Sequence, residues 1–115
     1  MDNTVTLAGT LSYDPVAKPT GDDKVPMCRF TIGVTRSWND RRSGERKEYT
    51  HHHEVVCYRE LATHVMESCR KGDSVVVVGR LNTRSNFDDG SKEKITEIVA
   101  DHVALDITHL SIPVE

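Results

Sequence analysis

Six aromatic residues occur in the 115-residue sequence, and some of them stand among cations instead of apolar residues. Trp38, the only tryptophan, lies in the polar segment 36–47, and Phe87 lies in the polar segment 80–94. Rings interleaved with cations suit a surface where unpaired nucleic-acid bases stack on the rings and phosphates meet the cations. The cations are Arg36, Arg41, Arg42, Arg46 and Lys47 in the first segment and Arg80, Arg84, Lys92 and Lys94 in the second.

Two further sites could contribute rings. Tyr58 closes the strand-like run 49–58, where it can either pack in the core or stack on a base. His51, His52 and His53 are consecutive, and on a strand only the first and third share a face. Because zinc would need further ligands from elsewhere in the chain, we expect no metal site. Imidazoles on an open face can instead stack on bases, donate to phosphates or stay as plain surface residues.

Catalytic signatures are missing from the sequence. It contains no G-x-S-x-G, H-E-x-x-H or P-loop motif. The three cysteines, Cys28, Cys57 and Cys69, are odd in number and form no C-x-x-C pair, which predicts buried free thiols instead of disulfides or a zinc site. We therefore expect a protein that is not an enzyme and has no cofactor.

The net charge of −3 argues at first against a nucleic-acid partner. The charge is unevenly distributed, however. Segments 36–47 and 70–94 carry +3 and +2, whereas 1–35, 48–69 and 95–115 carry −1, −3 and −4. No apolar run approaches the ~20 residues that cross a bilayer, and the N-terminus does not resemble a targeting signal. We expect one globular domain in the cytoplasm, associated with the nucleoid if DNA is the ligand.

Hydrophobic periodicity predicts three strands, one helix and two strands. This order is that of the OB-fold, an all-β, five-stranded Greek-key barrel with one α-helix between strands three and four. Its first strand must bend to join both sheets, and Gly9 suits that bend. The expected strands are 3–11, 27–36, 49–58, 75–81 and 94–107, the expected helix is 60–70, and the basic segments are expected as hairpin loops.

The second expected strand has two different faces. Cys28, Phe30 and Ile32 have the phase of the core, whereas Arg29 lies on a face that has no large apolar residue and is open to a ligand. In an OB barrel, the loops after strands one and four flank the face formed by strands two and three. Solvated hairpin tips are the simpler explanation for the cations in the basic segments.

Several short stretches of the chain match one known family in their order and spacing. They are NTVTLAG at 3–9, DP at 14–15, FTIGV at 30–34, SW at 37–38, GE at 44–45, Thr50 through VV at 55–56, ELA at 60–62, RKGD at 70–73 and GRL at 79–81. Through these stretches, residues from about 3 to 107 resemble the bacterial single-stranded DNA-binding protein family. This resemblance implies an OB-fold homotetramer that wraps single-stranded DNA in replication, recombination and repair, with Trp38 and Tyr58 at base-stacking positions.

The chain departs from the family pattern at two aromatic positions. His52 stands where the family usually has tryptophan or phenylalanine, and Asn86 stands near the family's last aromatic, with Phe87 one place on. We expect weaker binding per nucleotide as a result. The expected stacking residues are Trp38, Tyr58, Phe87 and His52. The expected phosphate or polar contacts are Arg29, Arg36, Arg41, Arg42, Arg46, Lys47, Arg80, Arg84 and Lys92.

The C-terminus also departs from the family, which commonly continues into a flexible tail with an acidic tip. We expect an OB domain over 1–110 and a short tail over 111–115, either a trimmed chain or a short form or paralogue that does not recruit partners through a tail. Two alternatives stay open. One is a dimeric OB module that binds a protein partner, and the other is a metal-dependent OB enzyme using His51 and His53.

Overall fold

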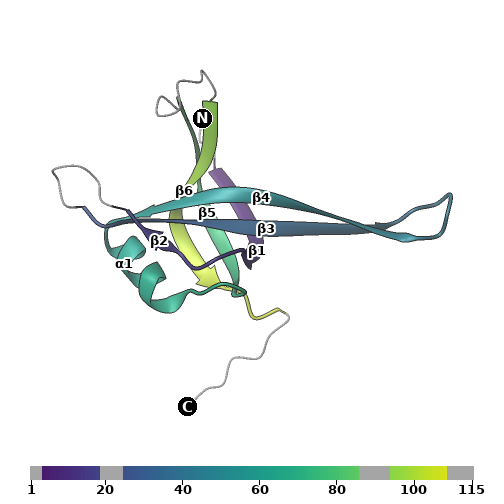
Figure 1. Cartoon of the computed structure of the whole chain (residues 1–115), viewed down its shortest axis with the longest axis horizontal. Coiled ribbons are helices and arrows are strands. Elements are labelled where there is room, and N and C mark those ends of the chain that lie inside the picture. Colours follow the sequence, from purple (N-terminus) through teal and green to yellow (C-terminus); the bar gives the residue numbers. More distant parts are fainter. Residues whose placement is uncertain (1–3, 19–24, 86–93, 109–115) are drawn as a thin grey trace, which may run out of the picture.

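A computed structural model describes residues 4–18, 25–85 and 94–108, except for the side chains of Arg84 and Ser85. The described part is a β-barrel with one helix at its base and one long two-stranded projection (Figure 1). In that part, no helix is long and apolar enough to cross a membrane. The elements are β1 (Thr4–Leu11), β2 (Val16–Ala17), β3 (Met27–Asn39), β4 (Arg46–Tyr58), α1 (Arg59–Ser68), β5 (Ser74–Ser85) and β6 (Lys94–Leu105).

Five of the strands close into a barrel. The sheet order is β1-β5-β6-β4-β3-β2, and a further pairing between β1 and β3 closes the barrel, with β2 outside it. All neighbouring pairs are antiparallel except β4 and β6, which run parallel at Val55↔Ile98 and Val56↔Val99. With the helix between β4 and β5, this arrangement confirms the expected OB-fold. The two-residue strand β2, which pairs with β3, was not predicted.

The core lies inside the barrel and above the helix. Phe30 is its largest fully buried side chain. Six other members are β-branched residues of the strands, which pack well on a pleated surface, namely Ile32, Val55, Val56, Val75, Val77 and Ile98. Helix α1 contributes Ala62 and Val65 from one face. The helix ends at Ser68, two residues earlier than predicted, because Cys69 is extended and Arg70 donates to the carbonyl oxygens of Met66 and Cys69.

Gly9 makes the closure of the barrel possible. Strand β1 pairs with β5 along Thr4–Thr10 and with β3 at Thr10 and Leu11, so it turns from one sheet into the other. A Cβ at Gly9 would lie 2.8 Å from the carbonyl oxygen of Gly33, too close for any side chain. At the predicted bend, the backbone of β1 thus passes so close to the backbone of β3 that only glycine fits at position 9.

The cysteines are buried free thiols, as predicted. Cys28 and Cys57 are direct partners across β3 and β4. Their mutual hydrogen bond, together with burial, raises the pKa of the Cys57 thiol, and burial also raises the pKa of Cys69. Cys57 and Cys69 are consequently poor nucleophiles at neutral pH, whereas the hydrogen bond with Cys57 lowers the pKa of the buried Cys28 thiol.

Strands β3 and β4 are longer than predicted. They stay paired from Met27↔Tyr58 out to Asn39↔Arg46, so residues 37–39 and 46–48, expected in a loop, are strand. The chain reverses within residues 40–45, where the amide of Gly44 donates to Asp40 O and the amide of Asp40 donates to Glu45 O. These strand ends were not predicted because neither of their faces is buried beyond the barrel, so their residues show no alternation of polar and apolar types. Residues 35–50 are called the arm below (Figure 1).

Candidate nucleic-acid interface

The arm has two faces, which the strand register defines. Residues directly opposite each other in an antiparallel pair project to the same side, and the sides alternate along each strand. The face continuous with the barrel interior is called the inner face, and the other the outer face. The inner face carries Arg36, Trp38, Lys47 and Tyr49 and continues toward the barrel with His51. The outer face carries Thr35, Ser37, Arg46, Glu48 and Thr50 and continues toward the barrel with His52.

Aromatic rings dominate the inner face. Trp38 is 49% exposed and Tyr49 is 57% exposed, so neither ring is core. The Tyr49 and His51 ring centroids are 4.4 Å apart, and those of His51 and His53 are 6.5 Å apart. Trp38 lies opposite Lys47, and Tyr49 lies opposite Arg36, which places a cation beside each large ring.

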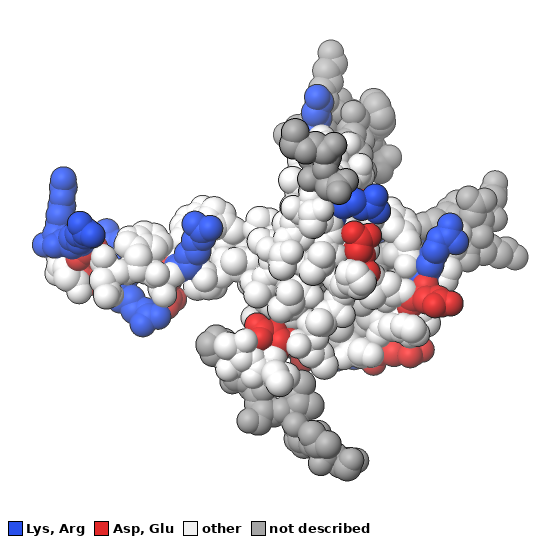
Figure 2. Space-filling model, turned by 180° about the vertical axis from the view of Figure 1, so that it is seen from behind, with Lys and Arg blue, Asp and Glu red and all other residues white. Residues whose placement is uncertain are grey.

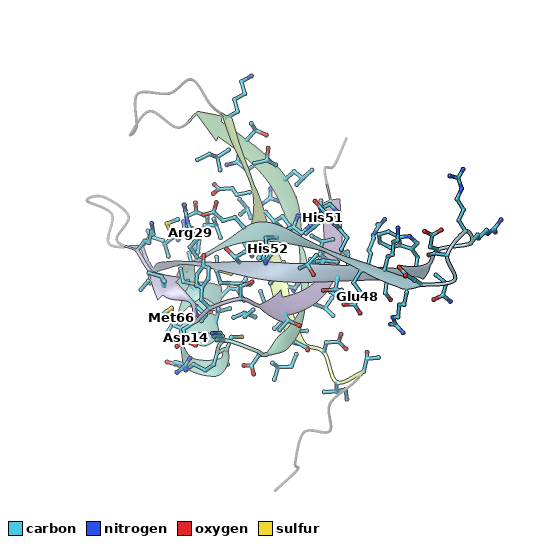
Figure 3. All side chains as sticks on the ribbon, turned by 45° about the vertical axis from the view of Figure 1, so that its right-hand side comes forward. Asp14, Arg29, Glu48, His51, His52 and Met66 are labelled. Carbon is cyan, nitrogen blue, oxygen red and sulfur yellow. The ribbon has the colours of Figure 1, made fainter. Side chains whose placement is uncertain are left out.

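Hydrogen bonds between polar side chains stabilise the outer face. Thr35 and Thr50 hydroxyls lie 2.9 Å apart, and Arg46 donates to the Ser37 hydroxyl at 3.1 Å. His52, labelled in Figure 3, stands opposite Gly33, and a Cβ at that glycine would be 3.7 Å from the imidazole. The His52 ring therefore lies near the backbone of Gly33 and is otherwise exposed to solvent. It cannot share a flat stacking surface with Trp38 on the opposite face.

The tip of the arm is organised by Asp40. Its carboxylate accepts from the Arg42 amide at 2.9 Å and pairs with Lys47 Nζ at 3.1 Å. The Arg42 amide first and Lys47 second lower the pKa of this carboxyl, so it stays ionised at neutral pH. Within the described ranges, Arg36, Arg41 and Arg42 form no ion pair, which leaves their charges available to a ligand.

Arg29 differs from the other predicted cations. Its guanidinium lies 2.8 Å from Glu54 and 3.7 Å from Glu97, and the Glu97 side chain is only 3% exposed. Two carboxylates therefore already surround this charge. The geometry favours a structural role for Arg29 over contact with a phosphate.

Tyr58 lies at the far end of β4 from the arm tip. It is eleven positions along β4 from Lys47, roughly 36 Å, so Tyr58 and Trp38 lie at widely separated places on the surface. Tyr58 is 39% exposed and lines a pocket of about 560 Å³ together with Pro26, Arg59 and Leu61. It is thus an accessible ring at the barrel, not a core residue.

The second basic segment is only partly described. Arg80 lies in β5, not in a loop, and its guanidinium is 3.5 Å from Asp101. Phe87 and Lys92 lie outside the described residues, as does the side chain of Arg84. The expected turn over 88–91 is also outside them.

The charged side chains are segregated over the surface. Figure 2 shows most of the Lys and Arg side chains in its view along the arm and at its tip, and most of the acidic ones on the barrel. This separation explains how a chain with net charge −3 can present a cationic surface. In the part of the chain that the structure describes, no cluster of three His, Cys, Asp or Glu side chains could hold a metal ion.

Tyr49 was missed as a candidate functional residue. Alternation along 49–58 gives it the same phase as the buried Val55 and Cys57, which conceals its exposure. A possible signal was the position of Tyr49 two residues from His51, since residues at that spacing share a face of a strand.

The barrel and the arm can now be compared with known proteins. The model of the Single-strand binding protein family matches residues 2–106. The chain belongs to this family. Its members bind single-stranded DNA and are not enzymes, which agrees with the binding function and the lack of catalysis expected from the sequence.

Two solved structures support the assignment. One is the crystal structure of the small single-stranded DNA-binding protein from Streptomyces coelicolor, with 27% identity and a TM-score of 0.78, over 96% of this chain and 98% of that one. The other is the Plasmodium falciparum single-stranded DNA-binding protein in complex with single-stranded DNA, with 26% identity and a TM-score of 0.78, over 90% of this chain and 93% of that one.

Proposed function

We propose that this family member binds and protects single-stranded DNA, with little preference for sequence, by holding it along the arm and the adjoining barrel face. The observation that carries the proposal is the pairing of exposed rings with cations on the inner face, Trp38 opposite Lys47 and Tyr49 opposite Arg36. Stacking is indifferent to base identity because every base has a π-face, and cations that contact phosphates carry no sequence information.

The proposed contacts divide by their surroundings. Trp38 and Tyr58 supply exposed rings at two separate places, and His52 supplies a ring on the outer face. Arg36, Arg41 and Arg42 are the strongest phosphate candidates, because no described carboxylate pairs with them. Three further cations are each paired with a carboxylate of the protein, and each would have to leave that carboxylate to contact a phosphate. They are Arg46, Lys47 and Arg80. Phe87, Arg84 and Lys92 complete the proposed set.

A homotetramer is the proposed assembly. Strand β1 pairs with β5 along its length but with β3 only at Thr10 and Leu11, so most of its second edge has no partner among the described strands. Leu81, Leu105 and Ile107 are exposed apolar side chains that a second copy could cover. We place the protein at single-stranded DNA of the nucleoid, in the cytoplasm, during replication, recombination and repair.

Titration of labelled oligo(dT) and of a duplex of equal length, at low and at high salt, tests the binding function. We expect tight binding to oligo(dT) with quenching of Trp38, affinity that falls as salt rises, and much weaker binding to the duplex. The mass of the complex in solution separates the tetramer from the dimer expected of a protein-interaction module. Unquenched Trp38 together with salt-independent binding would contradict the proposal.

A further inference from the structure

The three rings Tyr49, His51 and His53 lie on one face of β4 and lead from the barrel to the arm. They alternate with outer-face residues, so all three project to the same side. From His53 to Tyr49 they cover roughly 13 Å of strand. His53 is half-buried at the barrel edge, opposite the core residue Ile32, whereas His51 and Tyr49 are exposed. The row is thus anchored in the barrel at one end and open to solvent at the other.

We propose that this row, called the ring row below, is a base-stacking subsite for consecutive nucleotides of single-stranded DNA, with Tyr49 as its main contact. The inference rests on the proposed DNA-binding function and adds residues to it. It assigns a role to Tyr49, and it gives His51 and His53 a role in base stacking instead of metal binding.

The spacings within the ring row decide where bases fit. Stacked bases are roughly 3.4 Å apart, so a base inserted between two rings needs about twice that distance. The His51 and His53 centroids are 6.5 Å apart, but their ring planes are tilted by 36°, so a base cannot lie flat against both rings at once. Tyr49 and His51 are 4.4 Å apart and already in contact, which leaves the outward face of Tyr49 for a neighbouring base. The row accordingly offers the outward face of Tyr49 as its main place for a base, with the two imidazoles beside it.

Cations next to the ring row support the same ligand. Arg36 lies directly opposite Tyr49 and has no ion-pair partner among the residues described. A strand whose base stacks on Tyr49 would bring its phosphates within reach of this guanidinium. Two positions further out along each strand, on the same face, Trp38 and Lys47 repeat the combination of ring and cation. The inner face therefore forms one continuous path from the barrel to the arm tip.

Substitutions of exposed rings test the ring row with little risk to folding. Tyr49→Leu keeps apolar bulk but removes the aromatic ring, and Tyr49→Phe keeps the ring. His51→Leu tests the second ring, and His64→Leu changes an exposed histidine on α1, away from the arm. We expect oligo(dT) affinity to fall about tenfold in Tyr49→Leu and severalfold in His51→Leu. His64→Leu should stay within about twofold of the wild type, and Tyr49→Phe should recover most of the affinity that Tyr49→Leu loses.

Photocrosslinking of the wild-type protein gives an independent measurement. An oligo(dT) carrying 5-iododeoxyuridine should form adducts that map to Tyr49 or His51. Unchanged affinity in both leucine variants, or adducts only outside residues 49–53, would overturn the ring row while Trp38 quenching still reported DNA binding. If the wild type neither binds oligo(dT) nor quenches, the proposed function and the ring row fail together.

Discussion

Trp38 and Lys47 stand directly opposite each other near the tip of the β3–β4 ladder, so the only tryptophan and a lysine share one exposed face of the arm. Lys47 is also held 3.1 Å from Asp40, which keeps the ammonium group near the turn. A ring and a cation side by side on one face can meet a base and a phosphate of the same nucleotide. This pair defines the distal end of the proposed DNA path.

Trp38→Ala should weaken binding of oligo(dT) by about 1–3 kcal/mol, because one base loses its stacking partner. Trp38→Phe should retain most of the affinity, since a smaller aromatic face remains. Anisotropy of a labelled oligonucleotide measures both variants, because neither retains the tryptophan signal. Equal affinity for the alanine variant and the wild type would show that this ring is merely exposed.

Arg41→Ala combined with Arg42→Ala should flatten the salt dependence of binding. Each phosphate contact with a single strand contributes about 0.7 to the slope of log K against log salt, so losing two lowers the slope by about 1.4. Affinities measured across a salt series give this slope. Lys71→Ala, on the turn after the helix, removes one charge far from the arm and should leave the slope unchanged. A double variant with the wild-type slope would place DNA away from the arm tip.

Arg29→Met should destabilise the fold by about 3 kcal/mol, because it removes the guanidinium that lies 2.8 Å from Glu54 and 3.7 Å from the nearly buried carboxylate of Glu97. Combining it with Glu97→Gln should recover much of this loss, since the buried negative charge is then removed as well. Chemical denaturation measures the stability of each variant. Oligo(dT) affinity should change less than about twofold in the double variant. A large loss of affinity in that stable variant would show that Arg29 contacts a phosphate, as the sequence predicted.

Gly9→Ala should destabilise the barrel by about 1–3 kcal/mol, because its Cβ would lie 2.8 Å from the Gly33 carbonyl oxygen and push β1 away from β3. Thermal unfolding should show a loss of several degrees in Tm. Ala8→Val adds a larger side chain at the neighbouring, exposed position and should be tolerated. Equal Tm values for Gly9→Ala and the wild type would mean that β1 and β3 can move apart at this point without loss of stability.

Much of the fold follows from local sequence. Alternation of Cys28, Phe30 and Ile32 identifies the core face of β3, and the helical period after Glu60 identifies α1. These elements can be predicted because one side of each is buried, so apolar residues recur with the period of the strand or helix. The extended ends of β3 and β4 carry no such pattern, so their polar residues resemble a loop.

Candidate residues follow from the sequence as a set, but their individual roles do not. Composition and spacing indicate rings among cations, and the order of motifs resembles one family. The sequence places Arg29 and Arg36 on opposite faces of the same predicted strand, but it does not tell which of the two is paired with a carboxylate. In the structure, Glu54 and Glu97 from two other strands surround Arg29, whereas Arg36 has no described ion-pair partner.

The sequence by itself determined the barrel, its core and the residue types that make a DNA-binding surface. Only the tertiary structure decided which side chains share a face: Trp38 with Tyr49, and His52 on the other side. It also decided which cations are already paired within the protein. The physical reason is that strand register and ion pairs arise between segments far apart in the chain, whereas periodicity records only the burial of each segment.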